Sequence, residues 1–193
     1  MLNQDFRSGR AKGGNSKKTD ADGLRSFFAD IRGRHEPGDV TFLCIGTDRS
    51  TGDALGPLTG SALSDYGFPH VVGTLLAPCD AFSLEALLAD IPASRVVVAI
   101  DACLGQPQSV GSFLVSDEPL LPARSVGQAL PAVGHYSVAA VVNALGPKPY
   151  ATLQMTSLHH VMTMAGQIAS AAAEAFGMIA DAGANRLRGW PFI

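Results

Sequence analysis

Two kinds of hydrophobic pattern alternate along the chain and predict strands and helices in turn. The stretches 40–45 and 96–100 are apolar at almost every position, as in strands that are buried on both faces. In 22–33 and 157–176 the apolar residues recur every three or four positions, which predicts amphipathic helices. Strands that alternate with helices favour an α/β fold, in which helices cover both faces of a mostly parallel sheet.

Turn residues set the expected limits of the other elements. Pro57 suits the first position of a helix that stops at Gly67, and Asp80 suits the N-terminal cap of a helix that runs to about Ala89. Shorter apolar runs and breaks predict the rest of the chain. We expect strands at 70–76, 110–116 and 150–154, an extended connection at 117–134, and a helix at 135–145.

One folded domain between two tails is expected. Residues 1–20 are polar and rich in glycine, serine and lysine, which predicts a mobile tail. The domain should then span 21–180, with a short C-terminal tail at 181–193. No apolar run reaches the roughly 18 residues of a membrane-spanning helix. The N-terminus also lacks the apolar centre of a secretory signal, so we expect a cytoplasmic protein with no membrane partner.

Composition and charge exclude several classes of function. A net charge of −3 and an aromatic content of 7% argue against a surface that binds nucleic acid. The three cysteines, Cys44, Cys79 and Cys103, form no Cys-x-x-Cys pair, which fits a reducing compartment better than a disulfide scaffold. The sequence has no His-x-x-x-His pattern and no Cys/His cluster, so a structural zinc site is not expected.

Aspartates follow two of the predicted strands closely. Asp48 and Asp53 lie in a glycine-punctuated turn after the first strand, and Asp101 directly follows the strand at 96–100. Because the carboxyl ends of parallel strands meet at one edge of a sheet, we expect these side chains to converge. Paired carboxylates can share a proton and activate water against an amide, or they can hold a divalent metal. The alternative for each aspartate is a purely structural role in a turn or a cap.

Three residues near these aspartates are candidates for substrate binding. Arg49 could hold an acidic group of the substrate or lower the pKa of a neighbouring carboxylate, and it could equally be a surface charge. Gly52 and Gly105 lie in the turns after the two strands, where glycine permits close approach of a ligand. The first turn matches neither of the glycine motifs that bind phosphate groups.

Histidine and cysteine side chains offer further candidates. His135 could be a metal ligand or a general base, with an exposed helix cap as the alternative. Cys103 could be a nucleophile if a histidine approached it, but a small buried side chain is the favoured interpretation. His159 and His160 are adjacent on a predicted helix and point in different directions, so they are poor joint ligands.

Two motifs in the chain resemble a known family. They are Gly46-Thr-Asp-Arg-Ser-Thr-Gly-Asp-Ala-Leu-Gly-Pro57 and Ala99-Ile-Asp-Ala-Cys-Leu-Gly105, and together they resemble the sporulation proteins called the spore protease YyaC family. The resemblance covers roughly residues 38–170. That family is similar to the spore germination endopeptidase, an atypical aspartic protease, and to the hydrogenase maturation endopeptidases. The implied fold is a three-layer α/β/α sandwich of the phosphorylase/hydrolase-like type.

The resemblance implies specific roles for the candidate residues. The motif of the germination endopeptidase carries its two catalytic aspartates onto Asp53 and Asp101, with Asp48 orienting the loop or assisting the pair. No cofactor is expected on that interpretation, and the implied substrates are proteins or peptides, including small acid-soluble spore proteins. The maturation endopeptidases instead imply a nickel or zinc ion on Asp53, Asp101 and His135. A non-enzymatic sporulation protein that kept the fold is a third hypothesis. The resemblance to sporulation proteins implies the cytoplasm of a sporulating cell or the spore core.

Overall fold

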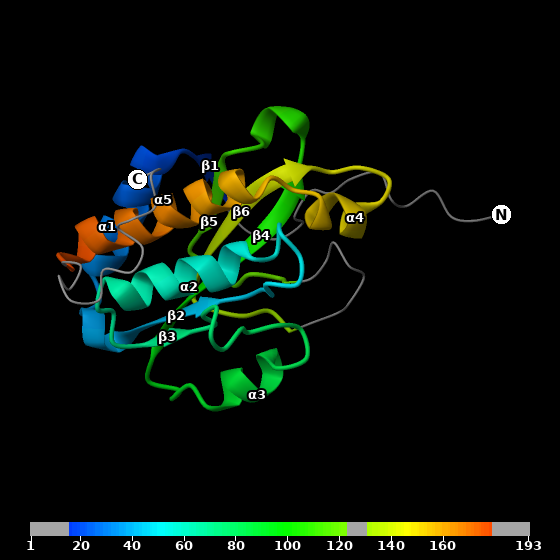
Figure 1. The fold of residues 1–193 in the computed structure, drawn as a ribbon. Coiled ribbons are helices and arrows are strands. Elements are labelled where there is room, and N and C mark those ends of the chain that lie inside the picture. The colour runs from blue at the N-terminus through cyan, green and yellow to red at the C-terminus, as the bar shows by residue number, and fades with distance from the viewer. Residues whose placement is uncertain (1–15, 123–130, 179–193) are drawn as a thin grey trace.

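The centre of the molecule is a mixed, mostly parallel β-sheet. In residues 16–122 and 131–178, which the computed structural model describes, six strands form one sheet in the order β1-β5-β6-β4-β2-β3 (Figure 1). The parallel strands are β2 (Val40–Cys44), β3 (Val71–Val72), β4 (Val96–Gly105) and β6 (Tyr136–Ala144). The antiparallel strands are β1 (Lys17–Thr19) and β5 (Phe113–Ser116). The predicted α/β class is confirmed.

Helices cover the two faces of this sheet unequally. One face, the thick face, carries α1 (Ala21–Arg32), α2 (Leu55–Asp65) and α5 (Leu158–Phe176) (Figure 1). The opposite, thin face carries α3 (Leu84–Ala89), and α4 (Pro149–Gln154) lies next to the end of β6. The described residues also include two short 3-10 helices, Pro37–Asp39 and Pro107–Ser109. The fold is the expected three-layer α/β/α sandwich. Within the described ranges, no helix is both long and apolar enough to cross a membrane.

The main hydrophobic core lies under the thick face. Four phenylalanines from α1, β2, the connection between α2 and β3, and the end of α5 pack edge to face or tilted there, with neighbouring ring centroids 4.8 to 6.2 Å apart. These residues are Phe28, Phe42, Phe68 and Phe176. The cluster lies toward the amino ends of the parallel strands, and this half of the molecule therefore holds much of the large apolar surface that drives folding.

Side chains of β4 alternate between the two faces. Val98, Ile100 and Ala102 belong to the core of the thick face, whereas Val97 and Ala99 belong to the smaller core of the thin face. Because successive side chains of a strand point in opposite directions, Asp101 and Cys103 face the thin side. Their half-burial fits a face that only a short helix covers.

The start of α2 packs unusually close to the sheet. A Cβ atom on Gly56 would lie 2.0 Å from the carbonyl oxygen of Ile45, and one on Gly60 would lie 2.1 Å from that of Gly73. Only glycine fits at such contacts. The helix begins at Leu55, two residues earlier than expected, so Pro57 occupies its third position. Asp53 consequently stands two residues before the first residue of α2, next to the N-cap Ala54.

Two predicted elements are wrong in type. Residues 135–145, predicted as a helix, contain strand β6, because this apolar run is buried between β4 and β5. Residues 150–154, predicted as a strand, belong to α4, where Pro149 takes the first helical position. The strands within 70–76 and 110–116 and the helix within 80–89 are shorter than predicted.

The predicted N-terminal tail also ends earlier than expected. Residues 17–19 form β1, and the Asp20 carboxylate caps α1 by accepting a hydrogen bond from the Gly23 N–H at 3.1 Å. The folded part therefore begins before residue 21. The remaining predictions for tails at 1–15 and 181–193, and for the connection at 123–130, lie outside the described residues.

Candidate functional site

The loop that carries Asp53 follows directly from β2. Ile45 extends the pairing of β2 with β4 by donating its N–H to the Ile100 oxygen at 2.8 Å. Gly46 then turns the chain with a φ of 147°. A Cβ atom on Gly46 would lie 2.0 Å from the Asp53 carbonyl oxygen, so only glycine leaves room for that oxygen. The Thr47 N–H donates to that same oxygen at 3.2 Å. Asp53 is thereby folded back over the end of β2, beside the strand that carries Asp101.

The Asp53 carboxyl is half-buried and holds its proton more readily than an exposed aspartate. Burial raises the pKa of Asp53, and the nearby Ser50 hydroxyl opposes this shift. Ser50 is 4% exposed, and its Oγ reaches no hydrogen-bonding geometry with any atom of the described residues. The hydroxyl therefore lies close enough to influence Asp53 without forming a regular hydrogen bond. A carboxyl with a raised pKa keeps its proton to a higher pH than an exposed aspartate, which suits a group that donates a proton.

Asp101 lies inside β4 and not in a loop after it. The strand was predicted to end at Ile100 but continues to Gly105. Asp101 Oδ1 accepts a hydrogen bond from the Ala102 N–H at 2.8 Å. The Ile100 oxygen still accepts a hydrogen bond from the Ile45 N–H. Ala102 therefore lies in the part of β4 that extends beyond the end of β2. The Asp101 carboxyl thus accepts from a backbone N–H that has no partner on β2, and this hydrogen bond orients the carboxyl.

Two thiols near Asp101 stay protonated. Burial raises the pKa of Cys103 to about 12, and the negative charge of Asp101 adds to the shift. Burial likewise raises the pKa of Cys79 to about 12, with smaller contributions from Asp80 and Asp101. A thiol is a good nucleophile only as a thiolate, so Cys103 is a weak one here. This agrees with its interpretation as a small packed side chain.

Arg49 holds the loop against the chain that precedes α3. Its Nη2 lies 2.8 Å from Asp80 Oδ2, and its Nε donates to Thr47 Oγ1 at 3.2 Å. Burial acts to raise the pKa of Asp80, but hydrogen bonds from Ser83 and Phe82 and the charge of Arg49 outweigh it, so the pKa is lowered. The Arg49 side chain is 71% exposed, and that of Asp80 is 22% exposed. Arg49 therefore compensates the charge of Asp80. Asp48, the residue before it, is exposed at the surface of the loop.

Gly52 and Gly105 are used for packing. The buried Gly52 donates its N–H to the Leu153 oxygen of α4 at 2.9 Å, and a Cβ would lie 2.9 Å from that oxygen. Gly105 ends β4, its carbonyl accepts from the Leu145 N–H at 2.7 Å, and a Cβ would lie 2.7 Å from Val141 Cγ1. Their proposed part in substrate binding has no support in these contacts.

The structure does not bring His135 to the two aspartates. His135 is exposed at the start of β6, where its N–H donates to the Val97 oxygen at 2.7 Å and its Nδ1 accepts from the Val97 N–H at 3.0 Å. Asp101 pairs with Ala139, four residues further along β6. At about 3.3 Å per residue, that offset is roughly 13 Å. His135 was expected before a helix, but a strand follows it, so it lies at the amino end of β6, away from the carboxyl ends of the parallel strands.

Two residues around the loop were not anticipated in their roles. Asp80 was expected as the N-terminal cap of a helix, but α3 begins at Leu84 with Ser83 as its N-cap. Asp80 instead accepts from the N–H groups of Phe82 and Ser83 and receives Arg49, which ties the loop to the segment before α3. Ser50 was not singled out at all. An Asp-x-x-Ser pattern at 80–83 was a readable signal for the turn, whereas burial of Ser50 beside Asp53 depends on the folded loop and has no signature in the sequence.

Comparison with known proteins places the chain in a family and a fold. The family model described as "Protein of unknown function (DUF1256)" matches residues 15–171. "Uncharacterized protein YyaC" of Bacillus subtilis (strain 168) is 44% identical over 135 residues, which cover 67% of this chain and 66% of that relative. The crystal structure of a NiFe hydrogenase maturation protease HycI from Thermococcus kodakarensis KOD1 matches 78% of this chain and 99% of that chain, with a TM-score of 0.53 and 17% identity. The resemblance inferred from the two motifs is confirmed.

Proposed function

The chain belongs to the DUF1256 family, and we propose that it is a peptidase-like hydrolase in which Asp53 and Asp101 activate water against a peptide bond. The observation that carries this proposal is the half-buried Asp53, with its raised pKa, at the same sheet edge as Asp101. The α/β fold shared with a maturation protease supports it. In parallel sheets this edge is the usual place for ligands.

The two carboxyl groups would divide the proton transfers between them. Asp101, oriented by the Ala102 N–H, accepts a proton from water as the water oxygen attacks the carbonyl carbon. Asp53, which holds its proton more readily than an exposed aspartate, donates it to the leaving nitrogen as the C–N bond breaks. The proton on Asp101 then passes to Asp53, which restores the starting state. Each carboxyl returns to its initial form after one cycle.

The resemblance to sporulation proteins supports a setting for this activity. We propose that the substrates are proteins or peptides of the sporulating cell or spore core, small acid-soluble spore proteins among them. The proposed compartment is the cytoplasm. The chain matches 66% of the length of its Bacillus subtilis relative, and these assignments concern the matched part.

A metal-dependent peptidase is the second candidate, because the shared fold includes a protease of NiFe hydrogenase maturation. The donor set of this chain does not fit such an ion. Asp53 and Asp101 supply two carboxylates, and in residues 16–122 and 131–178 no three His, Cys, Asp or Glu side chains are grouped to hold a metal. We therefore derive no step through a metal. Stoichiometric nickel or zinc in purified protein, lost in Asp101→Asn, would favour this candidate over the first.

The test compares cleavage by wild type, Asp53→Asn and Asp101→Asn. Spore protein extract and a peptide library are incubated with each protein, and the products are read by mass spectrometry. Loss of one acid–base group should reduce the rate by about 10²- to 10⁴-fold. Asp101→Asn should still fold, because the amide oxygen can accept the Ala102 N–H. Asp117→Asn, an exposed change after β5, is the matched control. Full cleavage by both active-site variants would overturn the proposal.

A further inference from the structure

Large exposed apolar side chains gather at the edge of the sheet that holds the aspartates. Nearly all those found in the described residues lie in the connections that follow β3, β4 and β6, and Leu121 is the exception. Scattered exposed apolar residues are normal, but a concentration at one edge marks an interaction surface. The full set is Leu75, Leu76, Phe82, Val110, Leu121, Leu145, Tyr150, Met155 and Leu158.

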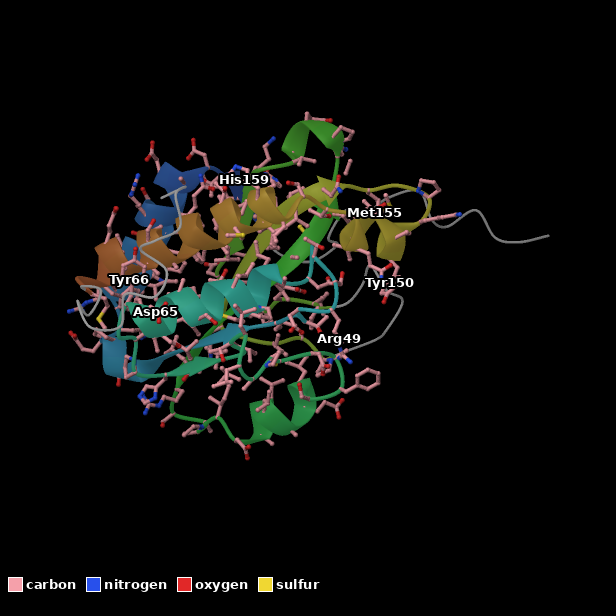
Figure 2. The ribbon with its side chains drawn as sticks, in the orientation of Figure 1. Arg49, Asp65, Tyr66, Tyr150, Met155 and His159 are labelled. Atoms are coloured by element: carbon pink, nitrogen blue, oxygen red, sulfur yellow. The ribbon has the colours of Figure 1, made fainter. Side chains whose placement is uncertain are left out.

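Two of these connections are bonded directly to the loop that carries Asp53. On one side, the Gly52 N–H donates to Leu153 of α4, and α4 ends in the exposed Met155. On the other side, Arg49 pairs with Asp80. Figure 2 shows Arg49, Tyr150 and Met155 at one end of the molecule, away from Asp65 and Tyr66 at the end of α2. The loop is thus flanked by apolar side chains on both sides.

Four of these side chains form what we call the apolar rim, which consists of Leu76, Phe82, Tyr150 and Met155. Their exposed fractions are 96%, 87%, 57% and 84%. The Asp80 carboxylate accepts from the N–H of Phe82 at 3.0 Å, so this ring stands next to the point where Arg49 is held. Phenylalanine and tyrosine lose little conformational entropy on binding and offer large contact areas, which makes them effective anchors.

The loop between the two halves of the rim carries one negative charge that no ion pair of the described residues matches. Asp48 is exposed, and within the described residues it takes part in no ion pair. The positive charge of Arg49 is already matched by Asp80. Lys148 is the N-cap residue of α4, two positions before Tyr150. An acidic ligand crossing the loop would therefore meet unfavourable charge, whereas a basic group would be attracted by Asp48.

Resting on the proposed peptidase function, we propose that the apolar rim binds an extended peptide with large apolar side chains on both sides of the cleaved bond. Phe82 and Tyr150 are its specificity-determining residues, and a basic residue of the peptide lies next to Asp48. An anionic membrane surface fits less well because it would approach the same acidic loop. A second copy docked symmetrically on this edge would bring two such loops face to face. A peptide can cross the loop while its side chains reach both halves of the rim.

The experiment measures binding separately from cleavage. Asp101→Asn protein is titrated by fluorescence anisotropy with a labelled peptide that has leucines on both sides of its central bond and a nearby lysine. Adding Phe82→Ala or Tyr150→Ala should weaken binding by about 10-fold or more, the usual effect of removing an interface anchor. Replacing the peptide leucines by serine, or its lysine by glutamate, should also weaken binding. Leu121→Ala, which truncates an exposed apolar residue after β5, is the matched control and should leave binding unchanged.

The outcomes distinguish this inference from the proposed function. Binding that depends on the apolar rim, without any cleavage by wild type, would support the inference and overturn the peptidase assignment. Cleavage that depends on Asp101 but ignores Phe82→Ala and Tyr150→Ala would do the reverse. Sedimentation of the wild type provides a second check. A dimer that dissociates in Tyr150→Ala would assign the apolar rim to a second copy of the chain and overturn the peptide proposal.

Discussion

The two ends of the parallel strands use their large side chains in opposite ways. Toward the amino ends of the strands, four phenylalanines are packed against one another in the core, and His35 Nε2 lies 3.2 Å from the Tyr136 hydroxyl. At the carboxyl ends, Phe82 and Met155 are exposed, while the Asp53 carboxyl is half-buried at a cost that its raised pKa reports. The difference teaches that the core that stabilises the fold and the site at which we propose chemistry lie at opposite ends of the parallel strands.

The carboxyl edge is nevertheless built with tight backbone contacts. Gly46 and Gly56 bring the loop and the first turn of α2 against backbone carbonyls, and Gly52 brings the same loop against α4. These contacts hold Asp53 in place without using large side chains. Rigid backbone support leaves the apolar side chains around it available for a ligand.

Truncation of an aromatic residue at each edge should give the largest contrast. Phe42→Ala removes a fully buried ring that touches Phe28, Phe68 and Phe176, and it should cost about 3–5 kcal/mol of unfolding free energy. Phe82→Ala removes an exposed ring and should change stability by less than about 0.5 kcal/mol. Urea unfolding of both variants measures this. Equal losses would show that both edges contribute to the core.

Glycine replacement tests the backbone contacts of the carboxyl edge. A methyl group at Gly56 meets the Ile45 carbonyl oxygen, so Gly56→Ala should destabilise the protein by about 1–3 kcal/mol or more. Gly38→Ala, with no atom within 4 Å of the added Cβ, is the control and should be nearly neutral. Thermal unfolding distinguishes them. A neutral Gly56→Ala would mean that α2 can move away from β2 without cost.

Neutralising Asp53 should stabilise the protein at neutral pH. Its folded-state pKa is raised above the ordinary 3.8, so stability is greatest below that value and falls as the pH rises through the raised pKa. Asparagine carries no charge, so Asp53→Asn should melt above the wild type at about pH 7 and equally at about pH 3. Asp48→Asn makes the same charge change on an exposed side chain and should leave the melting temperature unchanged. A destabilised Asp53→Asn at pH 7 would contradict the burial argument.

Loss of the loop's ion pair should have the smallest effect. Arg49→Ala removes an exposed partner of Asp80, and exposed pairs contribute about 0–1 kcal/mol. Removing that charge should also raise the pKa of Asp80, which carbon-detected NMR titration can follow. Arg34→Ala, an exposed arginine outside this contact, is the control. A loss well above 1 kcal/mol would mean that the pair does more than hold the loop against the segment before α3.

Elements with a strong local pattern could be predicted from the sequence. The two long helices α1 and α5 and the strands β2 and β4 were recognised because their periodicity or continuous apolar character is visible in a few residues. β6 could not be told from a helix, because its alanine- and valine-rich run suits both and only the neighbouring strands decide. β1 was not predicted as a strand, because its residues are polar and only their pairing with the apolar strand β5 makes them a strand.

The site shows the same limit. The common edge of the Asp53 loop and β4 follows from the parallel topology and was predicted, although the catalytic roles of the residues stay predictions. The position of His135 was not predictable, because it depended on whether β6 was a strand. The ion pair of Arg49 with Asp80 joins segments 31 residues apart and has no local signal.

The short strand β1 has a practical consequence for anyone who shortens this chain. Lys17 and Lys18 pair with Val115 and Leu114, so β1 occupies the outer side of β5. A protein beginning at Ala21 would lose this cover and present the open backbone of Phe113–Ser116 to other molecules. Such an edge is a template for aggregation, and two lysines on the natural outer strand discourage it. A shortened protein should therefore start before residue 17, so that β1 is kept.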